Sequence, residues 1–454
     1  MIGRRTGFAL LLLLLLAAIS AIVDSIDGMR EVLRTHMSTK TLYPPPSPPS
    51  EAGNSGDIPG SCVPVQLNYA IRHGTRNPTM KDITRIVDTH SRLLAFRNAA
   101  SEAAVTRTAW LETWTNPYPE ETAAGLADAG VAELIAMGQR LHARLADASP
   151  LHFDASKFVF EHTWKIRTRQ SAEAFAFGFF GGLQPVFYDT DPIGDDQVLR
   201  FFDNCPAFEM QIEQNKSATI EHRKYRDSEQ MMKNLATFRR LSGFPNATQK
   251  DLEAAYAGCA FDVAVRGVFD QWCALFDDEM LLAMDYFQDL KHFYRKSHGH
   301  ALAFEIAAPL LQDLFHSMKQ RVDGSSAVEG HFRFAHAETI LPLAALLNVS
   351  YFDRHASERE GHFRADTPLE LAVQRKFKSS TLAPFAANIG FVLYECAAEV
   401  EEAASTFRVK TLLNEREVIF SECNGQALCA FEDLERTFRR WLYEFDFQER
   451  CSIP

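Results

Sequence analysis

Apolar segments and helical patterns alternate along the first part of the chain, and this alternation predicts an α/β core. The extended apolar segment 65–71 predicts the first strand. Residues 121–146 predict a helix, because alanines and large apolar residues recur there at helical spacing. A second strand at 158–162, a helix at 171–180 and a short strand at 186–188 continue the pattern.

From about residue 195 the strand signals vanish, and the pattern stays helical as far as residue 320. The predicted helices are 227–241, 249–256, 277–295 and 301–320. The predicted elements after them are a strand at 331–335, a helix at 339–347, strands at 389–394, 408–413 and 418–421, and an edge hairpin around 414–417. We therefore expect an α-helical insertion, 195–320, that splits the α/β core into a first part, 60–194, and a second part, 321–454.

An N-terminal targeting segment precedes this predicted core. Two arginines and an apolar run at 8–23 predict a secretory signal peptide, residues 1–25. The run is slightly long for a signal peptide, so a signal anchor stays open as the alternative. Residues 26–59 contain the proline-rich stretch 43–50 and predict an extended linker, so that the folded part begins near Gly60. No second apolar stretch of comparable length follows, and we expect no membrane span after cleavage.

Composition and cysteine content are those of a secreted globular protein. The chain has 454 residues, 46% of them hydrophobic and 23% charged, and its formal net charge of −12 argues against nucleic acid as a partner. Its eight cysteines predict disulfides, with Cys423–Cys429 as the favoured local pair. Asn215, Asn246 and Asn348 begin Asn-X-Ser/Thr sequences and are candidate glycosylation sites. We expect an extracellular protein, with the ER lumen or the lysosome as alternatives.

The most informative motif is the octapeptide Arg-His-Gly-Thr-Arg-Asn-Pro-Thr at 72–79, directly after the first predicted strand. Open α/β sheets bind ligands at the carboxyl ends of their strands. Arg72 and Arg76 can neutralise and orient phosphate oxygens through bidentate hydrogen bonds. His73, between them, can act as a neutral nucleophile near physiological pH. The motif therefore predicts a site at which a histidine attacks an anionic phosphorus.

Two further segments add groups that phosphoryl transfer needs. Arg167 stands before a Ser-Ala-Glu-Ala-Phe sequence and is a candidate third phosphate-binding arginine, with Arg169 as the weaker candidate. His336 and Glu338 lie at a predicted strand-to-helix junction, where the first can donate to a phosphate oxygen and the second can protonate the leaving alkoxide. A metal held by His331, His336 and Glu338 is the alternative, but no Cys-x-x-Cys or other ligand spacing accompanies these residues.

These motifs resemble the signature of the histidine acid phosphatase branch of the histidine phosphatase superfamily, and the His-Ala-Glu form resembles its multiple inositol polyphosphate phosphatase branch. The resemblance implies an α/β core with a mostly parallel central sheet flanked by helices. It implies that His73 forms a phosphohistidine, that Glu338 is the acid, and that no metal or other cofactor is needed. The implied phosphate-binding groups are Arg72, Arg76, Arg167 and His336, and the implied residues for the rest of the substrate are Thr75, Lys81 and Arg85.

The expected protein is a secreted phosphomonoesterase that hydrolyses inositol polyphosphates, phytate included, with an acidic to mildly acidic pH optimum. Its partner is then a small polyphosphate substrate. Two alternatives stay open: a secreted histidine acid phosphatase of broad specificity, and a catalytically silent phosphate-binding protein. An intact nucleophile and an intact candidate acid argue against the silent protein, since a binder needs neither.

Overall fold

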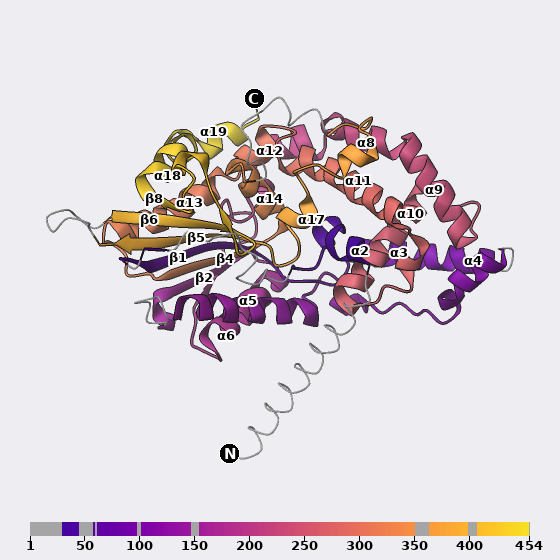
Figure 1. Ribbon diagram of the computed structural model, residues 1–454, viewed down its shortest axis with the longest axis horizontal. Helices are drawn as coiled ribbons and strands as arrows, with labels where there is room; N and C mark the ends of the chain where they lie inside the picture. The colour runs from indigo at the N-terminus through magenta and orange to yellow at the C-terminus, as the bar shows by residue number, and fades with distance from the viewer. Residues whose placement is uncertain are drawn as a thin grey trace, which may run out of the picture.

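The computed structural model describes residues 30–44, 58–59, 61–97, 101–146, 154–349, 363–397 and 406–453. The predicted signal peptide and most of the proline-rich stretch lie outside the described residues. Among the described residues, no helix is both long enough and apolar enough to cross a membrane. Figure 1 shows a sheet at one end of the molecule and a body of helices at the other.

One mixed sheet of eight strands has the order β3-β2-β4-β1-β5-β6-β7, with β8 paired to β6. The strands are β1 (Cys62–Arg72), β2 (Phe158–His162), β3 (Tyr188–Asp189), β4 (Gly330–Ala335), β5 (Asn388–Cys396), β6 (Thr406–Leu413), β7 (Arg416–Val418) and β8 (Leu428–Ala430). The pairs among β3, β2, β4 and β1 are parallel, whereas β5 pairs antiparallel with β1 and β6, and β6 pairs antiparallel with β7 and β8. Because β6 is two antiparallel steps from β1, most strands run in one direction, and the predicted α/β class is confirmed.

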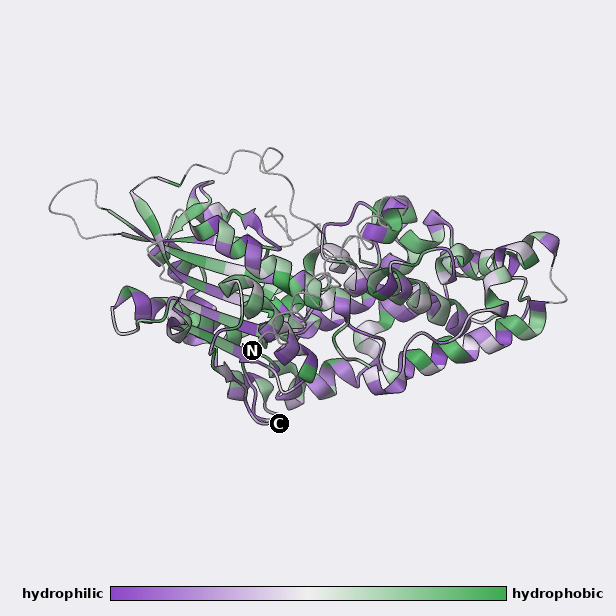
Figure 2. Ribbon diagram, turned by 90° about the horizontal axis from the view of Figure 1, so that it is seen from below, coloured by the Kyte–Doolittle hydropathy of each residue, from purple (hydrophilic) through white to green (hydrophobic). Residues whose placement is uncertain are grey.

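Helices cover both faces of the sheet, and the central strands β1 and β5 are buried along nearly their whole length. The covering helices are α5 (Asp128–Ala146) and α6 (Ile166–Phe180) on one face, and α13 (Ala308–Val322) and α14 (Ala337–Leu346) on the other (Figure 1). Phenylalanines of the strands and of α6 pack together on the first face, where the ring centroids of Phe175 and Phe332 are 4.9 Å apart. Figure 2 shows the strands to be largely hydrophobic.

α5 and α6 approach each other closely because a glycine lies at their contact. A Cβ on Gly178 would lie 2.0 Å from the carbonyl oxygen of Ile135. α5 begins at Asp128, later than predicted, and its Gly130 touches the loop after β1. A Cβ on Gly130 would lie 2.2 Å from the carbonyl oxygen of Thr75, so only glycine permits this contact. The fit holds the N-terminal end of α5 against the residues that follow β1.

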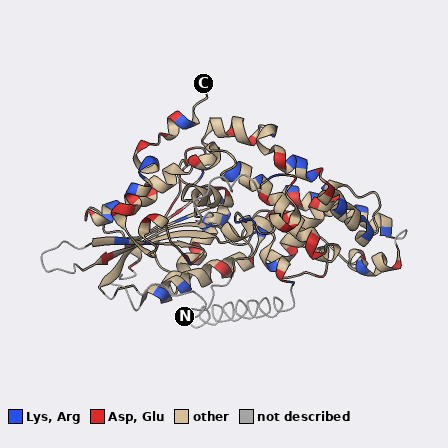
Figure 3. Cartoon of the chain, turned by 45° about the horizontal axis from the view of Figure 1, so that its top comes forward, with Lys and Arg blue, Asp and Glu red and all other residues tan. Residues whose placement is uncertain are grey.

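Residues 195–320 are all described, and they form helices and turns without a strand. The longer helices there are α9 (Glu229–Ser242), α10 (Gln249–Phe261), α11 (Asp278–Lys296) and most of α13. They share an apolar core with the sheet, from Trp272 and Tyr286 in the helical part to Ala335 and Phe391 in the strands. The helical part therefore packs directly on the sheet. Figure 3 shows the charged residues mainly on the helices and few on the strands.

The structure corrects the interpretation of residues 30–44, which the sequence placed in an extended linker. The segment forms helix α2 (Glu31–Thr35) and the 3-10 turn η1 (Ser38–Lys40). Leu33 and Met37 are buried in the core, and the Ser38 amide donates to Asp285 of α11 at 2.8 Å. Burial of these apolar side chains favours the ordered segment, and the neighbouring prolines obscured that short apolar pattern.

Four disulfides join the cysteines: Cys62–Cys396, Cys205–Cys451, Cys259–Cys273 and Cys423–Cys429. The last of them confirms the predicted local pair. The first joins β1 to β5 at positions that pair in the sheet. The predicted hairpin is also confirmed, since β6 and β7 pair antiparallel around Asn414 and Glu415, whose φ angles are 50° and 64°.

Candidate active site

The site begins where β1 ends, because the parallel strands β1 and β4 bring their carboxyl ends side by side. Arg72, the last residue of β1, pairs in register with Ala335, the last residue of β4. His73 comes next, and its amide donates to the carbonyl of Ala335 at 3.0 Å. His336 follows Ala335, and the centroids of the two imidazole rings are 5.5 Å apart. The two predicted histidines therefore meet at one edge of the sheet.

The His73 ring carries its proton on Nδ1, which leaves the other ring nitrogen, Nε2, free to act as a nucleophile. Its Nδ1 lies 2.8 Å from the carbonyl oxygen of Gly74, which can only accept, so Nδ1 carries the proton and Nε2 the lone pair. Burial lowers the pKa of His73 well below its usual value, and the charges of Arg167 and Arg72 lower it further. A neutral imidazole with its lone pair on Nε2 can act as a nucleophile over a wide pH range.

Backbone groups and aromatic rings position the arginines of the octapeptide. Nη1 of Arg72 donates to the carbonyl of Thr39 at 2.5 Å, and the guanidinium carbon lies 4.4 Å from the centroid of the Phe385 ring. The guanidinium of Arg76 lies 5.6 Å from the centroid of the Phe261 ring. Carbonyl oxygens and ring faces orient these cations without neutralising their charge. The positive charge therefore stays available to a ligand.

His336 connects two arginines, one of which the sequence analysis missed. Arg167 lies on the first turn of α6, which begins earlier than predicted, and its Nη2 is 3.2 Å from Nδ1 of His336. Nη1 of Arg200 is 2.8 Å from the other ring nitrogen, Nε2, which also lies 2.9 Å from the Thr163 hydroxyl. A neutral imidazole accepts at one nitrogen only, so both arginines cannot donate to this ring at once. An anion between them would give each arginine an acceptor.

Two of the buried guanidinium donors that have no acceptor in the described part of the chain belong to arginines of this site. They are the Nε–H groups of Arg72 and Arg167. A buried donor without an acceptor costs about 1–3 kcal/mol, so each such group calls for an explanation. Burial lowers the pKa of Arg72 to about 9 and that of Arg167 to about 10, which leaves both charged at neutral pH. An anion with several oxygen acceptors, such as phosphate, satisfies both the charge and the donors.

Glu338, the candidate acid, forms an ion pair in this site. It lies in the first turn of α14 with its side chain 45% exposed, and Nζ of Lys296 donates to its Oε1 at 2.6 Å. Burial raises the pKa of Glu338, but the Lys296 ammonium lowers it more, and the pKa lies well below its usual value. A cavity of about 310 Å³ opens beside this pair, and Lys291 and Arg295 also line it.

The residues predicted to hold the rest of the substrate have other surroundings than the two histidines. Thr75 is fully buried, and its amide and hydroxyl donate to the carboxylate of Glu133 at 2.7 Å and 2.9 Å, so it supports the loop instead of facing a ligand. Lys81 is exposed near the start of α3 (Met80–Phe96). Arg85 is half-buried in α3, and its charge acts on a carboxylate of α10. Among the described residues, no hydrogen bond joins these side chains to either histidine.

Five cationic residues near the site belong to none of the motifs found in the sequence. They are Lys40, Arg200, Lys291, Arg295 and Lys296. Lys40 comes from η1, and its Nζ lies 5.7 Å from the centroid of the Phe261 ring. Burial lowers the pKa of Lys40 to about 8, and the charge of Arg76 adds to this shift. The lysines and the arginine of α11 share its last turns, and their helical spacing was the only signal in the sequence.

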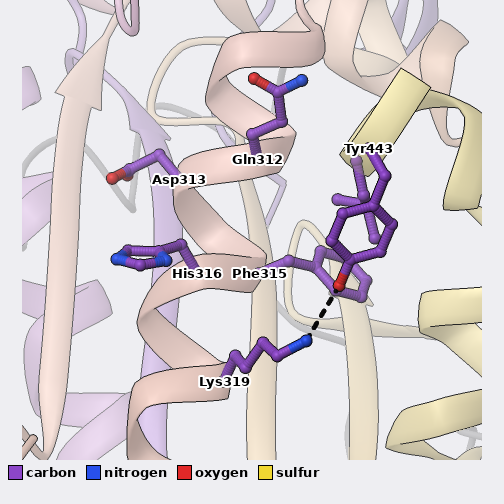
Figure 4. A pocket seen from close by; sticks show the side chains of 7 residues that line it. Gln312, Asp313, Phe315, His316, Lys319 and Tyr443 are labelled. Atoms are coloured by element: carbon purple, nitrogen blue, oxygen red, sulfur yellow. Dashed lines mark hydrogen bonds between the residues drawn. The ribbon is translucent and has the colours of Figure 1, made fainter. Parts of the chain in front are cut away.

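A second cavity, of about 430 Å³, lies between α13 and the turn at 440–444, and Figure 4 shows its lining side chains. His316 and Lys319 extend from α13, and Lys319 donates to the Tyr443 hydroxyl at 3.2 Å. Its lining residues include no arginine, so this cavity lacks the bidentate donors that suit a phosphate.

The structure does not support the metal alternative. Within the described residues, the group that converges closely enough to hold a metal is Glu161, Asp313 and His331. The guanidinium of Arg333 bonds to Asp313 and lies 2.7 Å from Nδ1 of His331, so a cation already occupies this group. His331 therefore belongs to a network of its own, whereas both nitrogens of His336 face arginines.

The three candidate glycosylation sites, Asn215, Asn246 and Asn348, are all exposed. Their side chains are therefore accessible, and glycosylation stays a prediction. The oxidised cysteines fit an oxidising compartment.

The fold and the histidine–arginine site together define the class of this protein. The model of the histidine phosphatase superfamily (branch 2) matches residues 65–414, and the chain belongs to this family. The resemblance seen in the sequence is thereby confirmed, and the protein is a histidine acid phosphatase by family.

Two individual proteins similar to this chain share one name within the family. The chain is similar to multiple inositol polyphosphate phosphatase 1 from Gallus gallus, at 30% identity over 87% of this chain and 86% of the relative. The relative of the same name from Homo sapiens is 27% identical over 95% of this chain and 92% of its own.

Two solved structures show that the fold is shared. The phytase from D. castellii has a TM-score of 0.75 at 18% identity, over 92% of this chain and 87% of that one. The multiple inositol polyphosphate phosphatase from Bifidobacterium longum, in complex with inositol hexasulfate, has a TM-score of 0.64 at 17% identity, over 89% of this chain and 97% of that one.

Proposed function

We propose that this protein hydrolyses the phosphomonoesters of inositol polyphosphates, phytate included, through a phosphohistidine. The observation that carries the proposal is the neutral His73 ring, whose Nε2 lone pair lies in a group of cations with buried, unused donors on Arg72 and Arg167. Relatives named multiple inositol polyphosphate phosphatase, and the solved one bound to inositol hexasulfate, support this substrate class.

In the proposed reaction, Nε2 of His73 attacks phosphorus in line and the bond from phosphorus to the alkoxide breaks. The nonbridging oxygens are held by Arg72, Arg76, Arg167 and His336 as charge redistributes. Glu338 gives its proton to the leaving oxygen and then takes one from the water that attacks the phosphohistidine. Hydrolysis releases phosphate and restores His73.

Several phosphate groups suit this site better than one. The arginines and histidines at the sheet edge provide for the phosphate that is removed. Lys40 comes from η1, and Lys291, Arg295 and Lys296 of α11 line the cavity beside Glu338, where Asp203, Glu209 and Glu213 add carboxylates. A ligand that carries further phosphates would engage these cations. Secretion to an extracellular site fits the disulfides.

A histidine acid phosphatase of broad specificity is the second candidate. The chain is 23% identical, over 86% of its length, to the thiamine-repressible acid phosphatase pho4 of Schizosaccharomyces pombe. The arginines and histidines that follow β1 and β4 would bind the phosphate group of any monoester. They would not distinguish one alcohol from another. The cations of α11 therefore carry the distinction between the two candidates.

The test is phosphate release from phytate by the purified protein with EDTA present, compared with release from p-nitrophenyl phosphate. We expect release that prefers phytate and disappears in His73→Ala. His316→Ala is the matched control, because His316 lies in the other cavity and bonds to Gln320. Release from p-nitrophenyl phosphate alone would favour the broad phosphatase. Undiminished release by His73→Ala would overturn the proposed nucleophile.

A further inference from the structure

Lys296 forms an ion pair with the residue that the proposed reaction needs as an acid. Its Nζ lies 2.6 Å from Oε1 of Glu338, and its own side chain is only 12% exposed. Lys296 is the last residue of α11, whereas Glu338 is the second residue of α14. The pair therefore bridges the helical part of the molecule and the carboxyl edge of the sheet.

The cavity beside this pair is also lined by Lys291 and Arg295, and Arg295 has a different partner. Nη1 of Arg295 lies 2.9 Å from a carboxylate oxygen of Glu213, and both residues line the cavity. Lys296 is the lining cation whose partner is Glu338. A phosphate that enters the cavity meets the Lys296 ammonium and the Glu338 carboxylate together, and it attracts the first and repels the second.

The surroundings of Glu338 keep it ionised before the substrate arrives. The charged and titratable groups that face it are Lys291, His292 and Lys296 of α11, Arg72 and Arg76 at the end of β1, Arg167 of α6, and His336 beside it. Asp203, Glu209 and Glu213 also line the cavity, but the group that bonds to the Glu338 carboxylate is the Lys296 ammonium. A general acid must be protonated to donate a proton. Without substrate, the site therefore holds Glu338 in the ionised state, which cannot do so.

We propose that Lys296 is a positioning residue that keeps Glu338 ionised until a second phosphate of the substrate takes the ammonium group. The inference rests on the proposed function and deepens it. A phosphate of about two negative charges competes with the carboxylate for Lys296, and its own charge favours the protonated form of Glu338. Solvent supplies that proton. An ester with a single phosphate, held by the arginines at the sheet edge, leaves the ion pair intact.

With this arrangement, a polyphosphate substrate promotes the protonation of Glu338, the acid that its own hydrolysis needs. An inositol polyphosphate is then favoured in the chemical step as well as in binding. A single-phosphate ester with an alkoxide leaving group meets a deprotonated Glu338 and reacts slowly above acidic pH. p-Nitrophenyl phosphate differs, because its phenolate leaves without a proton and its rate does not report on the acid.

The experiment compares Lys296→Met with the wild type on glycerol 3-phosphate and p-nitrophenyl phosphate between pH 4 and pH 8. We expect the ratio of glycerol 3-phosphate to p-nitrophenyl phosphate turnover at pH 6 to rise about tenfold, since one unit in the pKa of the acid is a factor of ten in its protonated fraction. The alkaline limb for glycerol 3-phosphate should move to higher pH, and KM for phytate should rise. Lys296→Arg should keep the wild-type limb.

Arg295→Met is the matched control, because it removes a cation of the same cavity whose partner is Glu213. It should raise KM for phytate without moving the limb. An unmoved limb in Lys296→Met, or a limb that moves equally in Arg295→Met, would overturn the inference. Should Lys296→Met fail to fold, the wild type alone decides: its kcat for phytate must keep its alkaline limb at higher pH than its kcat for glycerol 3-phosphate. Wild-type rates in Glu338→Gln on glycerol 3-phosphate would instead refute the proposed acid.

Discussion

At the scale of single residues, the site depends on a histidine that stays neutral among guanidinium groups. Burial, Arg167 and Arg72 all lower the pKa of His73. The carbonyl of Gly74 fixes the proton on Nδ1 and so leaves Nε2 for attack. The same cations that orient a phosphate therefore protect the nucleophile from protonation in acid.

His73 should make stability, but not nucleophilicity, sensitive to pH below about 6.5. Because its folded-state pKa is lowered, the unfolded ring binds a proton at pH 5 that the folded ring does not. The resulting loss in the free energy of unfolding is absent above pH 6.5 and reaches at most about 2 kcal/mol at pH 5. Urea unfolding at both pH values should show a smaller loss in His73→Asn than in the wild type. Equal losses would contradict the lowered pKa.

Arg167→Gln should lower kcat on p-nitrophenyl phosphate by about a hundred- to a thousandfold, because one preorganised donor to the developing charge is lost. Arg169→Gln is its control: that arginine is 56% exposed and bonds to Glu173 one turn further on α6. We expect near wild-type turnover in the control. Steady-state kinetics of the two variants check this. Equal losses of kcat in both variants would show that Arg167 has no special role in the site.

At the scale of elements, a short N-terminal segment completes the site. The carbonyl of Thr39 holds Arg72, and Lys40 comes from the same turn. Asp285 of α11 accepts a hydrogen bond from the Ser38 amide of this segment, and Asp285 and its neighbour Asp289 are both bonded to the buried Arg375. The N-terminal segment, α11 and the end of β1 therefore form one connected unit.

Lys40→Gln should raise KM for phytate severalfold and change kcat on p-nitrophenyl phosphate much less, because the lysine belongs to the region for further phosphates. Lys233→Gln is the control, since Lys233 is exposed on α9 and pairs with Glu279. The measurement is steady-state kinetics with both substrates. An equal loss of turnover on both substrates would assign Lys40 a structural role.

Leu33→Ala should lower the free energy of unfolding by about 2–5 kcal/mol, the usual effect of removing a buried leucine side chain. Leu33 is 1% exposed and packs in the main core. Leu371→Ala is the control, because that leucine is 45% exposed. Urea denaturation measures both, and a negligible effect at Leu33 would mean that the segment does not support the fold.

At the scale of the whole molecule, disulfides and a shared core hold distant parts of the chain together. Cys205–Cys451 closes a loop of 246 residues and ties the C-terminal helix α19 (Phe447–Cys451) to the helical part, whereas Cys423–Cys429 closes a loop of 6. A long closed loop restricts the unfolded chain more than a short one.

Removal of Cys205–Cys451 by paired serine substitutions should therefore destabilise the protein more than removal of Cys423–Cys429. The chain-entropy estimate is about 5 kcal/mol for the first and about 2 kcal/mol for the second. Urea denaturation of the two double variants provides the comparison. A larger loss for the short loop would show that local packing outweighs chain entropy here.

Much of the fold could be predicted because its signals are local. The strand at 65–71 lies within β1, and the strand at 331–335 lies within β4. Helix starts were harder, since α6 begins at Ile166 and not at Ser171. The polar first turn of α6 carries no apolar pattern, and tertiary contacts of Thr168 with Thr163 and of Arg167 with His336 stabilise it in place of local propensity.

The sequence by itself determined the parts of this protein whose chemistry is local: a histidine between two arginines at the end of a strand, a second histidine and a glutamate at the next one, and an even set of cysteines. Only the tertiary structure decided that Lys40, Arg200 and Lys296 belong to the site and that Thr75 supports the loop. It also decided that the Lys296 ammonium bonds to Glu338 and lowers the pKa of that carboxyl group. The reason is that charge interactions depend on distance in space, and segments far apart in the chain supply these charges.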